Sequence, residues 1–420
     1  MQNSQLTSIQ KKRIEIGVDL ETMATILGLG PAGAGKVSEW ENGKALPEKI
    51  VRRLAKVPAQ LPYKKINGRH KFSFIDLFAG VGGIRIPFQE KGGECVFTAE
   101  WDKHSQITYA ANFGEVPNRG GDITAFPAKD IPAHNVLLAG FPCQAFSQAG
   151  RKEGFLDTRG TMFFEIQRIL AHHKPEAFLL ENVKQLRGHD KGRTLATIMA
   201  TLRGDAHPDI PDNVPMSDEA RESLSTRLNY DVNFRVLRAR DFGVPQNRER
   251  IFILGLKRQP GQQTPDHERI SRIFDRVEYK HQATVRLSQA LLPDSDYTRS
   301  FEISDRLWRG HLERKARNKA NGKGFGYSLF KRDSDYCNTI SARYYKDGSE
   351  ILIDQSHLGL NPRKLTPEEA RAIQGFGDDF RIDFVSAAQA YRQFGNSVAV
   401  PVIRAIATEL IPELDALLGC

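Results

Sequence analysis

Cysteine is scarce in this sequence of 420 residues, and what the chain lacks excludes several classes of protein. Its four cysteines, Cys95, Cys143, Cys337 and Cys420, lie far apart with no paired spacing. Neither a disulfide framework nor a zinc site is indicated, and we expect no metal ion. No apolar stretch approaches the length of a membrane span, and no signal-type apolar core follows the polar start. We therefore expect a cytoplasmic protein without a membrane partner.

Positive charge is in excess. Lysine and arginine number 60 against 51 aspartates and glutamates, which gives a net charge of +9. Such an excess favours a polyanionic partner without identifying one. At this length the chain can form two or three domains with a large apolar core. The motifs must decide whether the partner is a nucleic acid.

Changes of pattern divide the chain into parts. Residues 1–56 show helical periodicity, and residues 57–71, with prolines and several lysines, are typical of a linker. Strands then alternate with helices over 72–259, which predicts an α/β domain built on a parallel sheet covered on both faces. The rhythm stops in 260–360, where mostly irregular or β structure is expected. We assign 361–420 to the α/β domain.

The segment 140–147, Gly-Phe-Pro-Cys-Gln-Ala-Phe-Ser, directly follows the apolar run 136–139. Such a run predicts a buried parallel strand, so Cys143 would lie in the loop at its carboxyl end, where open α/β sheets keep their active sites. Pro142 restricts the backbone beside the thiol. A lone cysteine is more often an inert buried thiol, so a nucleophilic Cys143 requires partners from other segments.

Two further segments offer such partners. Glu181 follows the apolar run 177–180 and would reach the same edge of the sheet, where desolvation disfavours its charged form and suits it to deliver a proton. Arg248 and Arg250 stand on alternate residues between two predicted strands, so one face of an extended segment would carry both. Their donors suit a carbonyl oxygen or a phosphate.

A glycine-rich turn, 79–83, links a predicted strand to a helix, and the next strand ends at Glu100. A carboxylate there can accept hydrogen bonds from both hydroxyls of a ribose. Trp101 offers an aromatic face for an adenine. The ligand is therefore expected to carry an adenosine, and a dinucleotide remains an alternative at this point.

Taken together and in order, these motifs closely resemble those of the DNA (cytosine-5)-methyltransferases. The resemblance covers roughly residues 72–404 and implies a Rossmann-like S-adenosylmethionine-dependent methyltransferase sheet. It implies that the Cys143 thiolate attacks C6 of a cytosine flipped out of the duplex, while Glu181 gives or shares a proton at N3. The loop with Arg248 and Arg250 closes over the base in this family, and Arg250 matches the arginine that contacts the cytosine O2.

The same resemblance implies a site for S-adenosylmethionine built from both ends of the α/β domain. The glycine-rich turn would wrap the cofactor, Glu100 would hold the ribose, and Asp122 would accept from the adenine amino group. The full set of positions implied is Asp76, Phe78, Gly80, Gly82, Gly83, Glu100, Trp101, Asp122, Ile123, Pro142, Asn396, Ser397 and Val398.

The segment 260–360 lies where this family keeps its target recognition domain. Within it, 322–327 and 339–348 resemble the bacterial Dcm-type subgroup that modifies CCWGG, and a related CCNGG-type site is the alternative. The basic stretch 311–323 suits phosphates, or is simply a solvated charged face. The DNA contacts expected are Gln144, Ser147, Gln148, Lys323, Arg343 and Lys346.

Within residues 1–56, the run 37–47, Val-Ser-Glu-Trp-Glu-Asn-Gly-Lys-Ala-Leu-Pro, resembles the recognition helix and following turn of phage-repressor-type helix-turn-helix domains. The implied recognition helix would bring Lys36, Ser38 and Glu39 to a major groove of operator DNA, although the turn 30–35 is longer than usual. A helical cap packed on the enzyme is the alternative. The resemblance leaves open a transcriptional autoregulator and an RNA cytosine methyltransferase, with a NAD-linked oxidoreductase as a more distant alternative. A monomer associated with the nucleoid is expected.

Overall fold

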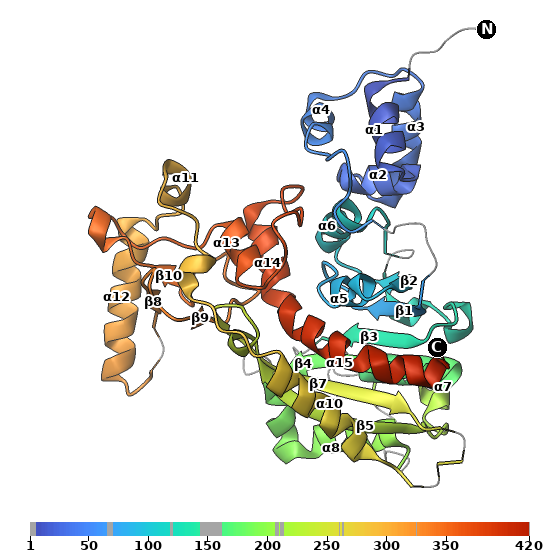
Figure 1. Ribbon diagram of the computed structural model, residues 1–420. Helices are drawn as coiled ribbons and strands as arrows, with labels where there is room; N and C mark the ends of the chain where they lie inside the picture. The colour runs from blue at the N-terminus through green and yellow to red at the C-terminus, as the bar shows by residue number, and fades with distance from the viewer. Residues whose placement is uncertain are drawn as a thin grey trace, which may run out of the picture.

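The computed structural model describes residues 6–64, 70–117, 121–142, 162–205, 210, 214–259, 261–262, 264–324 and 326–419. Within them, Figure 1 shows a central domain with a mixed sheet, a second lobe to its left and a helical bundle above it. The segment 143–161, which contains Cys143, lies outside the described residues.

A six-stranded sheet forms the centre of the molecule, in the order β2-β1-β3-β4-β7-β5. β1 to β4 are parallel, and β7 runs antiparallel to both β4 and β5. β3 and β4 are apolar along almost their whole length because helices cover both faces. This arrangement confirms the predicted Rossmann-like α/β fold, but the sheet is mixed rather than parallel as expected, because a short connection joins β5 directly to its antiparallel neighbour β7. The strands are β1 (Phe72–Leu77), β2 (Gly93–Ala99), β3 (Val136–Gly140), β4 (Ala177–Val183), β5 (Tyr230–Arg238) and β7 (Glu249–Lys257).

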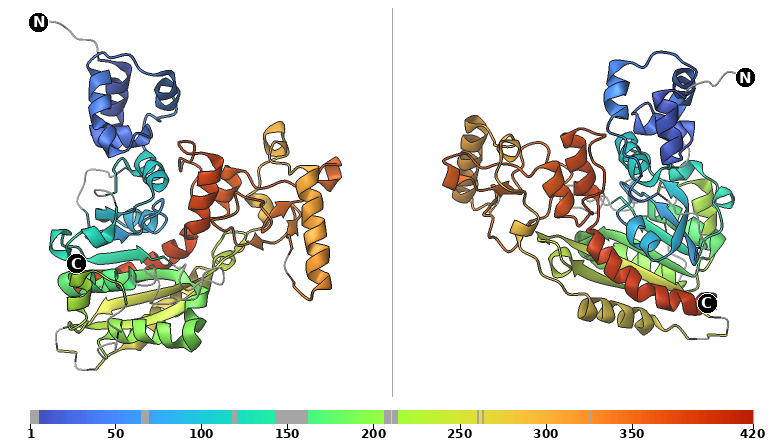
Figure 2. Two further views of the ribbon diagram at one scale, coloured as in Figure 1. Left: turned by 180° about the vertical axis from the view of Figure 1, so that it is seen from behind. Right: turned by 45° about the horizontal axis from the view of Figure 1, so that its top comes forward.

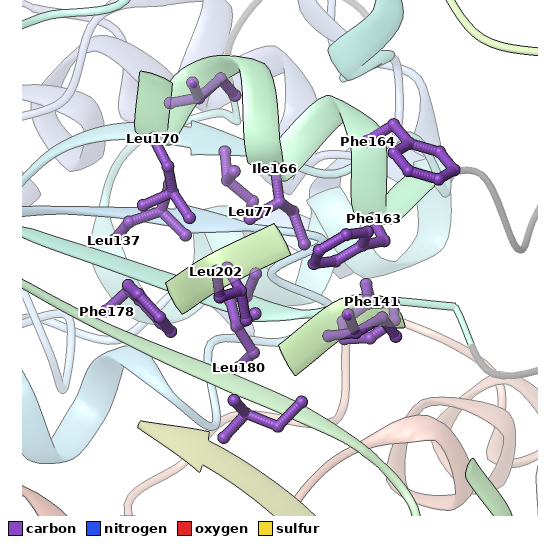
Figure 3. Packing of buried hydrophobic residues seen from close by; sticks show 14 of the residues in the cluster. Leu77, Leu137, Phe141, Phe163, Phe164, Ile166, Leu170, Phe178, Leu180 and Leu202 are labelled. Atoms are coloured by element: carbon purple, nitrogen blue, oxygen red, sulfur yellow. The ribbon is translucent and has the colours of Figure 1, made fainter. Parts of the chain in front are cut away.

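Two apolar clusters hold helices against the two faces of the sheet. Figure 3 shows part of one, in which Phe141 and Phe163 lie side by side with ring centroids 6.4 Å apart. The second cluster includes Ile270, Phe274 and Val277, so the first helix of segment 260–360 packs on the sheet. The covering helices are α7 (Met162–His173) and α8 (Arg193–Arg203) on one face, and α5 (Arg85–Glu90), α10 (His267–Lys280) and α15 (Val400–Leu418) on the other.

A third apolar cluster joins segment 260–360 to the C-terminal segment and also includes Val81 and Phe113 of the central domain. Ile340 and Tyr344 pack there with Ile373 and Phe394. Figure 2 shows the second lobe beside the sheet from two further directions. Its elements are α11 (Asp296–Arg299), α12 (Asp305–Ala320), β8 (Leu329–Phe330), β9 (Cys337–Asn338), β10 (Leu352–Ile353), α13 (Pro367–Ala372) and α14 (Ala387–Asn396), and β9 pairs with β6 (Gln246–Asn247).

The N-terminal bundle stands on one helix of the central domain, α6 (Lys103–Phe113) (Figure 1). Its apolar cluster includes Ile107, Ala110 and Ala111 of α6, and also Phe384. The bundle therefore packs on the central domain. It consists of α1 (Ser8–Ile16), α2 (Leu20–Ile26), α3 (Ala34–Glu41) and α4 (Glu48–Leu54), while the short α9 (Asp218–Ser223) lies in the insertion after α8.

The stretch 387–418 is long and apolar enough to cross a membrane, but 72% of its most apolar window is buried inside the protein. Its helix α15 contributes Ile403, Ile406 and Leu410 to the cluster on the sheet. This burial is that of a core helix.

Candidate active site

The ends of β3 and β4 bring Glu181 and the start of the segment that leads to Cys143 to one edge of the sheet. Gly140 is paired with Glu181 across the two strands, and Cys143 follows Gly140 by three residues. The Asn182 side-chain amide donates to the carbonyl oxygen of Phe141 at 3.3 Å, which ties β4 to the start of the Cys143 loop. The positions of Cys143, Gln144, Ser147 and Gln148 lie outside the described residues, and Pro142 is the last described residue before them.

Glu181 and Arg250 form an ion pair at this edge. Arg250 Nε lies 3.1 Å from Glu181 Oε1, and the two side chains are 16% and 11% exposed. Burial raises the pKa of Glu181, while Arg250 and Arg248 act against that shift. Because burial prevails, the carboxyl keeps its proton to a higher pH than an exposed glutamate, as a proton donor needs.

Arg248 has different partners from Arg250. The sequence predicted one face for both guanidinium groups, but Arg248 lies in the break between β6 and β7, where the strand alternation is interrupted. Its side chain is 2% exposed and donates to three backbone carbonyls, those of Ile340 (3.2 Å), Gly395 (3.1 Å) and Ser397. All three belong to the second lobe or to the segment that follows α14.

The glycine-rich turn after β1 is held by Glu100. Gly80 N donates to Glu100 Oε2 at 2.7 Å, and Asp102 N donates to Oε1 at 2.7 Å. Burial raises the pKa of Glu100, and these hydrogen bonds lower it. Phe78, with φ of 56°, and Gly80, with φ of 57°, bend the backbone sharply past the carboxylate. Trp101 is 76% exposed next to it.

The C-terminal motif packs directly against that turn. A Cβ placed on Gly83 would lie 2.9 Å from Ser397 Oγ and 3.0 Å from Val398 Cγ2, so a larger residue here would force Ser397 or Val398 to shift. Asn396 ends α14 and is exposed, and Ser397 to Ala399 join α14 to α15. The motif thus lies between two helices and does not open the last one, and it contacts the turn at Gly83.

Asp76 carries an unpaired carboxyl below the turn. It is fully buried, neither oxygen has a hydrogen-bond partner, and burial raises its pKa to about 7. A buried carboxyl without a hydrogen-bond partner needs a donor, and the ammonium group of S-adenosylmethionine is one. The nearby Glu100 carboxylate suits the ribose hydroxyls of this cofactor, and the Trp101 ring suits its adenine. Asp76, Glu100 and Trp101 would hold it, and it would supply a methyl group.

The remaining predicted cofactor residues have local roles in the structure. Asp122 Oδ1 accepts from Thr124 N at 3.0 Å, and the buried Ile123 accepts at its carbonyl from Arg168 at 2.7 Å. Arg168 was not singled out from the sequence, because it is one of many arginines on a helix. Gly82 packs under the Phe113 ring, which makes it a support of the turn.

The three described DNA-contact candidates, Lys323, Arg343 and Lys346, are all exposed on the second lobe. Lys323 follows α12, while Arg343 and Lys346 lie in the turn between β9 and β10. Gln246 is a further residue that the sequence analysis did not assign. It is fully buried and accepts from Ile340 N at 3.1 Å. Its position two residues before Arg248 was the available signal.

Comparison with known proteins decides the family. The model of the C-5 cytosine-specific DNA methylase family matches residues 72–205 and 218–412. The chain belongs to this family. It is a DNA (cytosine-5-)-methyltransferase of the restriction-modification type that acts on double-stranded DNA, and S-adenosylmethionine is its methyl donor.

Individual relatives agree with this assignment. The chain is 47% identical over 412 residues to the type II methyltransferase M.SsoII of Shigella sonnei, covering 97% of this chain and 98% of that one. It is 46% identical over 412 residues to M1.ScrFI of Lactococcus lactis subsp. cremoris, covering 97% and 95%. The S. pombe Dnmt2 methyltransferase structure shares the fold, with a TM-score of 0.59 at 18% identity over 83% of this chain and 99% of that chain.

Proposed function

We propose that this methyltransferase modifies cytosine within CCWGG after flipping the base out of the duplex, with Cys143 as nucleophile. The observation that carries the proposal is the Glu181–Arg250 pair, whose glutamate is opposite Gly140, three residues before Cys143. A base inside the helix cannot reach a carboxyl held at the end of a buried strand, so extrusion is required.

The residues divide the chemistry among them. The Cys143 thiolate adds to C6, and Glu181 delivers a proton to N3, so that electron density moves to C5. S-adenosylmethionine supplies the methyl group that C5 accepts. Loss of the C5 proton then restores the C5–C6 double bond and expels the thiolate, and N3 returns its proton to Glu181. Arg250, held against Glu181, is suited to donate to the cytosine O2.

The sequence specificity rests on segments 322–327 and 339–348, which resemble the CCWGG-modifying subgroup. Arg343 and Lys346 are exposed in the second of them, and Lys323 lies in the first. A related CCNGG-type site is the alternative. The test is transfer of labelled methyl from S-adenosylmethionine to duplexes with CCWGG, CCSGG or a scrambled site. Label on CCWGG alone supports the proposal, label on both CCWGG and CCSGG supports the CCNGG-type alternative, and label only on another duplex overturns both.

Cytosine in RNA is the competing substrate. In the second lobe, α12 carries the exposed Arg309, Arg317 and Lys319, whose charges suit contacts with the phosphates of a duplex. The same labelling experiment with an RNA of matched sequence separates the two substrates. Methyl transfer to RNA with none to DNA would overturn the assignment.

A second proposed activity is operator binding by residues 1–56. In α3, Val37 and Trp40 are buried, whereas Lys36 and Glu39 are exposed and Ser38 is half-buried, so one face remains available for a groove. Footprinting of the full chain on the DNA upstream of its own gene tests this proposal. A footprint that Lys36→Ala with Ser38→Ala abolishes, at unchanged methyl transfer, supports it, and its absence leaves only the packing role on α6.

A further inference from the structure

The segment that follows β9 is bound to the loop 246–250, Gln-Asn-Arg-Glu-Arg, which carries Arg248 and Arg250. β6 and β9 pair in parallel, and Thr339 Oγ1 donates to Asn247 O at 2.7 Å. Both backbone groups of Ile340 are then engaged. Its N–H donates to Gln246 Oε1 at 3.1 Å, and its carbonyl accepts from Arg248 at 3.2 Å. The recognition segment 339–348 therefore begins from a fixed point on the loop.

The other side of this segment contacts residues 395–398, at the end of α14 and directly after it. A Cβ on Gly395 would lie 2.3 Å from both Ala342 N and Ser341 C, so the two backbones are in direct contact. Arg248 also donates to the carbonyls of Gly395 and Ser397. Ser397 in turn lies against Gly83 of the glycine-rich turn.

The chemistry of Arg248 suits a junction. A guanidinium presents five donors in a rigid plane, which can satisfy three carbonyls at fixed angles, whereas an ammonium on a flexible stem cannot hold the same geometry. Arg248 is 2% exposed, so an unmet donor or carbonyl there would have no water to replace it. Two residues further on, Arg250 pairs with Glu181.

We propose that Arg248, supported by Gln246, is a positioning residue that couples sequence recognition to catalysis. It keeps the segment 339–348 in register with Arg250 on one side and with the Gly395–Val398 motif on the other. When the segment 339–348 contacts the correct DNA sequence, Arg248 thereby holds Arg250 and Glu181 in the position that aligns the target base. This proposal rests on the assignment of 339–348 as a recognition segment but not on the CCWGG sequence itself.

The experiment compares kcat/KM on the preferred duplex with kcat/KM on duplexes that differ from it by one base pair. The variants are Arg248→Met, Arg248→Lys and Gly395→Ala. The last of these disturbs the same contacts but leaves the arginine side chain in place. Arg363→Met is the matched control, because Arg363 is similarly buried in the second lobe but its side chain donates to Lys364 O and to Glu369, away from the loop with Arg248. Wild type, measured first, defines the preferred duplex.

The discrimination ratio is kcat/KM on the preferred duplex divided by kcat/KM on a duplex with one changed base pair. We expect Arg248→Met and Gly395→Ala each to lower this ratio by about tenfold or more, which is the range of one base-pair contact. Arg248→Lys should restore part of the ratio, and Arg363→Met should leave it unchanged. If Arg248 instead acts on the base or only supports the fold, activity falls equally on all duplexes, and the proposal is overturned. A wild type that prefers a site other than CCWGG defeats the specificity proposal alone.

Should Arg248→Met fail to fold, Arg248→Lys and Gly395→Ala decide the matter. An unchanged discrimination ratio in both would also overturn the proposal. The KM for S-adenosylmethionine provides a second readout, since the same residue holds the Ser397 carbonyl. We expect it to rise with Arg248→Met and to stay constant with Arg363→Met.

Discussion

Arg250 Nε lies 3.1 Å from Glu181 Oε1, across the antiparallel ladder of β4 and β7. The ladder pairs Val183 with Arg250, which brings the arginine to the strand end where Glu181 lies. The pair is almost fully buried, so its charges interact strongly, but burial still raises the pKa of Glu181. Glu181 thus takes up a proton more readily than an exposed glutamate, and Arg250 is fixed beside it. This arrangement suits the transfer of a proton.

Glu181→Gln should lower kcat by about 100-fold or more, because the amide cannot give a proton to N3. The pH profile is the sharper measurement. Since the pKa of Glu181 is raised and its protonated form acts, wild-type kcat should fall as pH rises through that pKa. Glu181→Gln should lose this limb of the profile.

Glu369→Gln is the control for this prediction. Glu369 is fully buried and pairs with Arg363 at 2.7 Å, in the second lobe. Loss of that pair should reduce stability and leave the shape of the pH profile intact. An alkaline limb that persists in Glu181→Gln would mean that another group titrates, and the proton would have to be assigned to that group.

Glu100→Gln should raise the KM for S-adenosylmethionine by about 10- to 100-fold, the usual worth of hydrogen bonds to a buried charged acceptor. The kcat at saturating cofactor should change little, because Glu100 accepts from the Gly80 amide and, in the proposed role, would hold the ribose rather than the reacting base. Steady-state kinetics at varied cofactor concentration measures both. Glu94→Gln, in the strand β2 that Glu100 follows, should leave KM unaltered, and an equal effect in both variants would contradict the assigned role.

Asp76→Asn should stabilise the cofactor-free protein at pH 8 by about 1–2 kcal/mol while weakening cofactor binding. The pKa of Asp76, about 7, is raised above its unfolded value, so its favourable contribution is present below about pH 4 and is lost as pH rises through 7. Urea unfolding at pH 5 and pH 8 measures the difference. A variant less stable than wild type at pH 8 would show that the buried carboxylate has a stabilising partner.

The N-terminal bundle should detach when the apolar surface of α6 on which it packs is made polar. Ala110 is fully buried in the cluster shared with the bundle, so Ala110→Asp would bury an unpaired charge there. We expect rapid protease cleavage in residues 57–71 of the variant and slow cleavage in wild type. The exposed Lys103→Asp on the same helix should behave as wild type. Equal cleavage of all three proteins would contradict docking on α6.

The sequence predicted those elements whose pattern is contained in a short stretch of neighbouring residues. Apolar runs marked β3 and β4, and the residues at their ends, including Glu181, follow from strand geometry. The partners of Arg248 could not be predicted in this way, because they are backbone carbonyls 92 and about 150 residues away, and a carbonyl is present at every position. The packing of α10 on the sheet likewise depends on tertiary contacts that its composition does not specify.

The most direct test of the central claim uses a duplex in which the target cytosine carries fluorine at C5. Because fluorine cannot leave as a proton does, the enzyme should remain covalently bound once the methyl group is transferred. We predict a complex stable to denaturation that requires S-adenosylmethionine, with the DNA attached to the peptide containing Cys143. No complex should form with Cys143→Ala. Methyl transfer by wild type without any covalent complex, or attachment at another residue, would contradict the account.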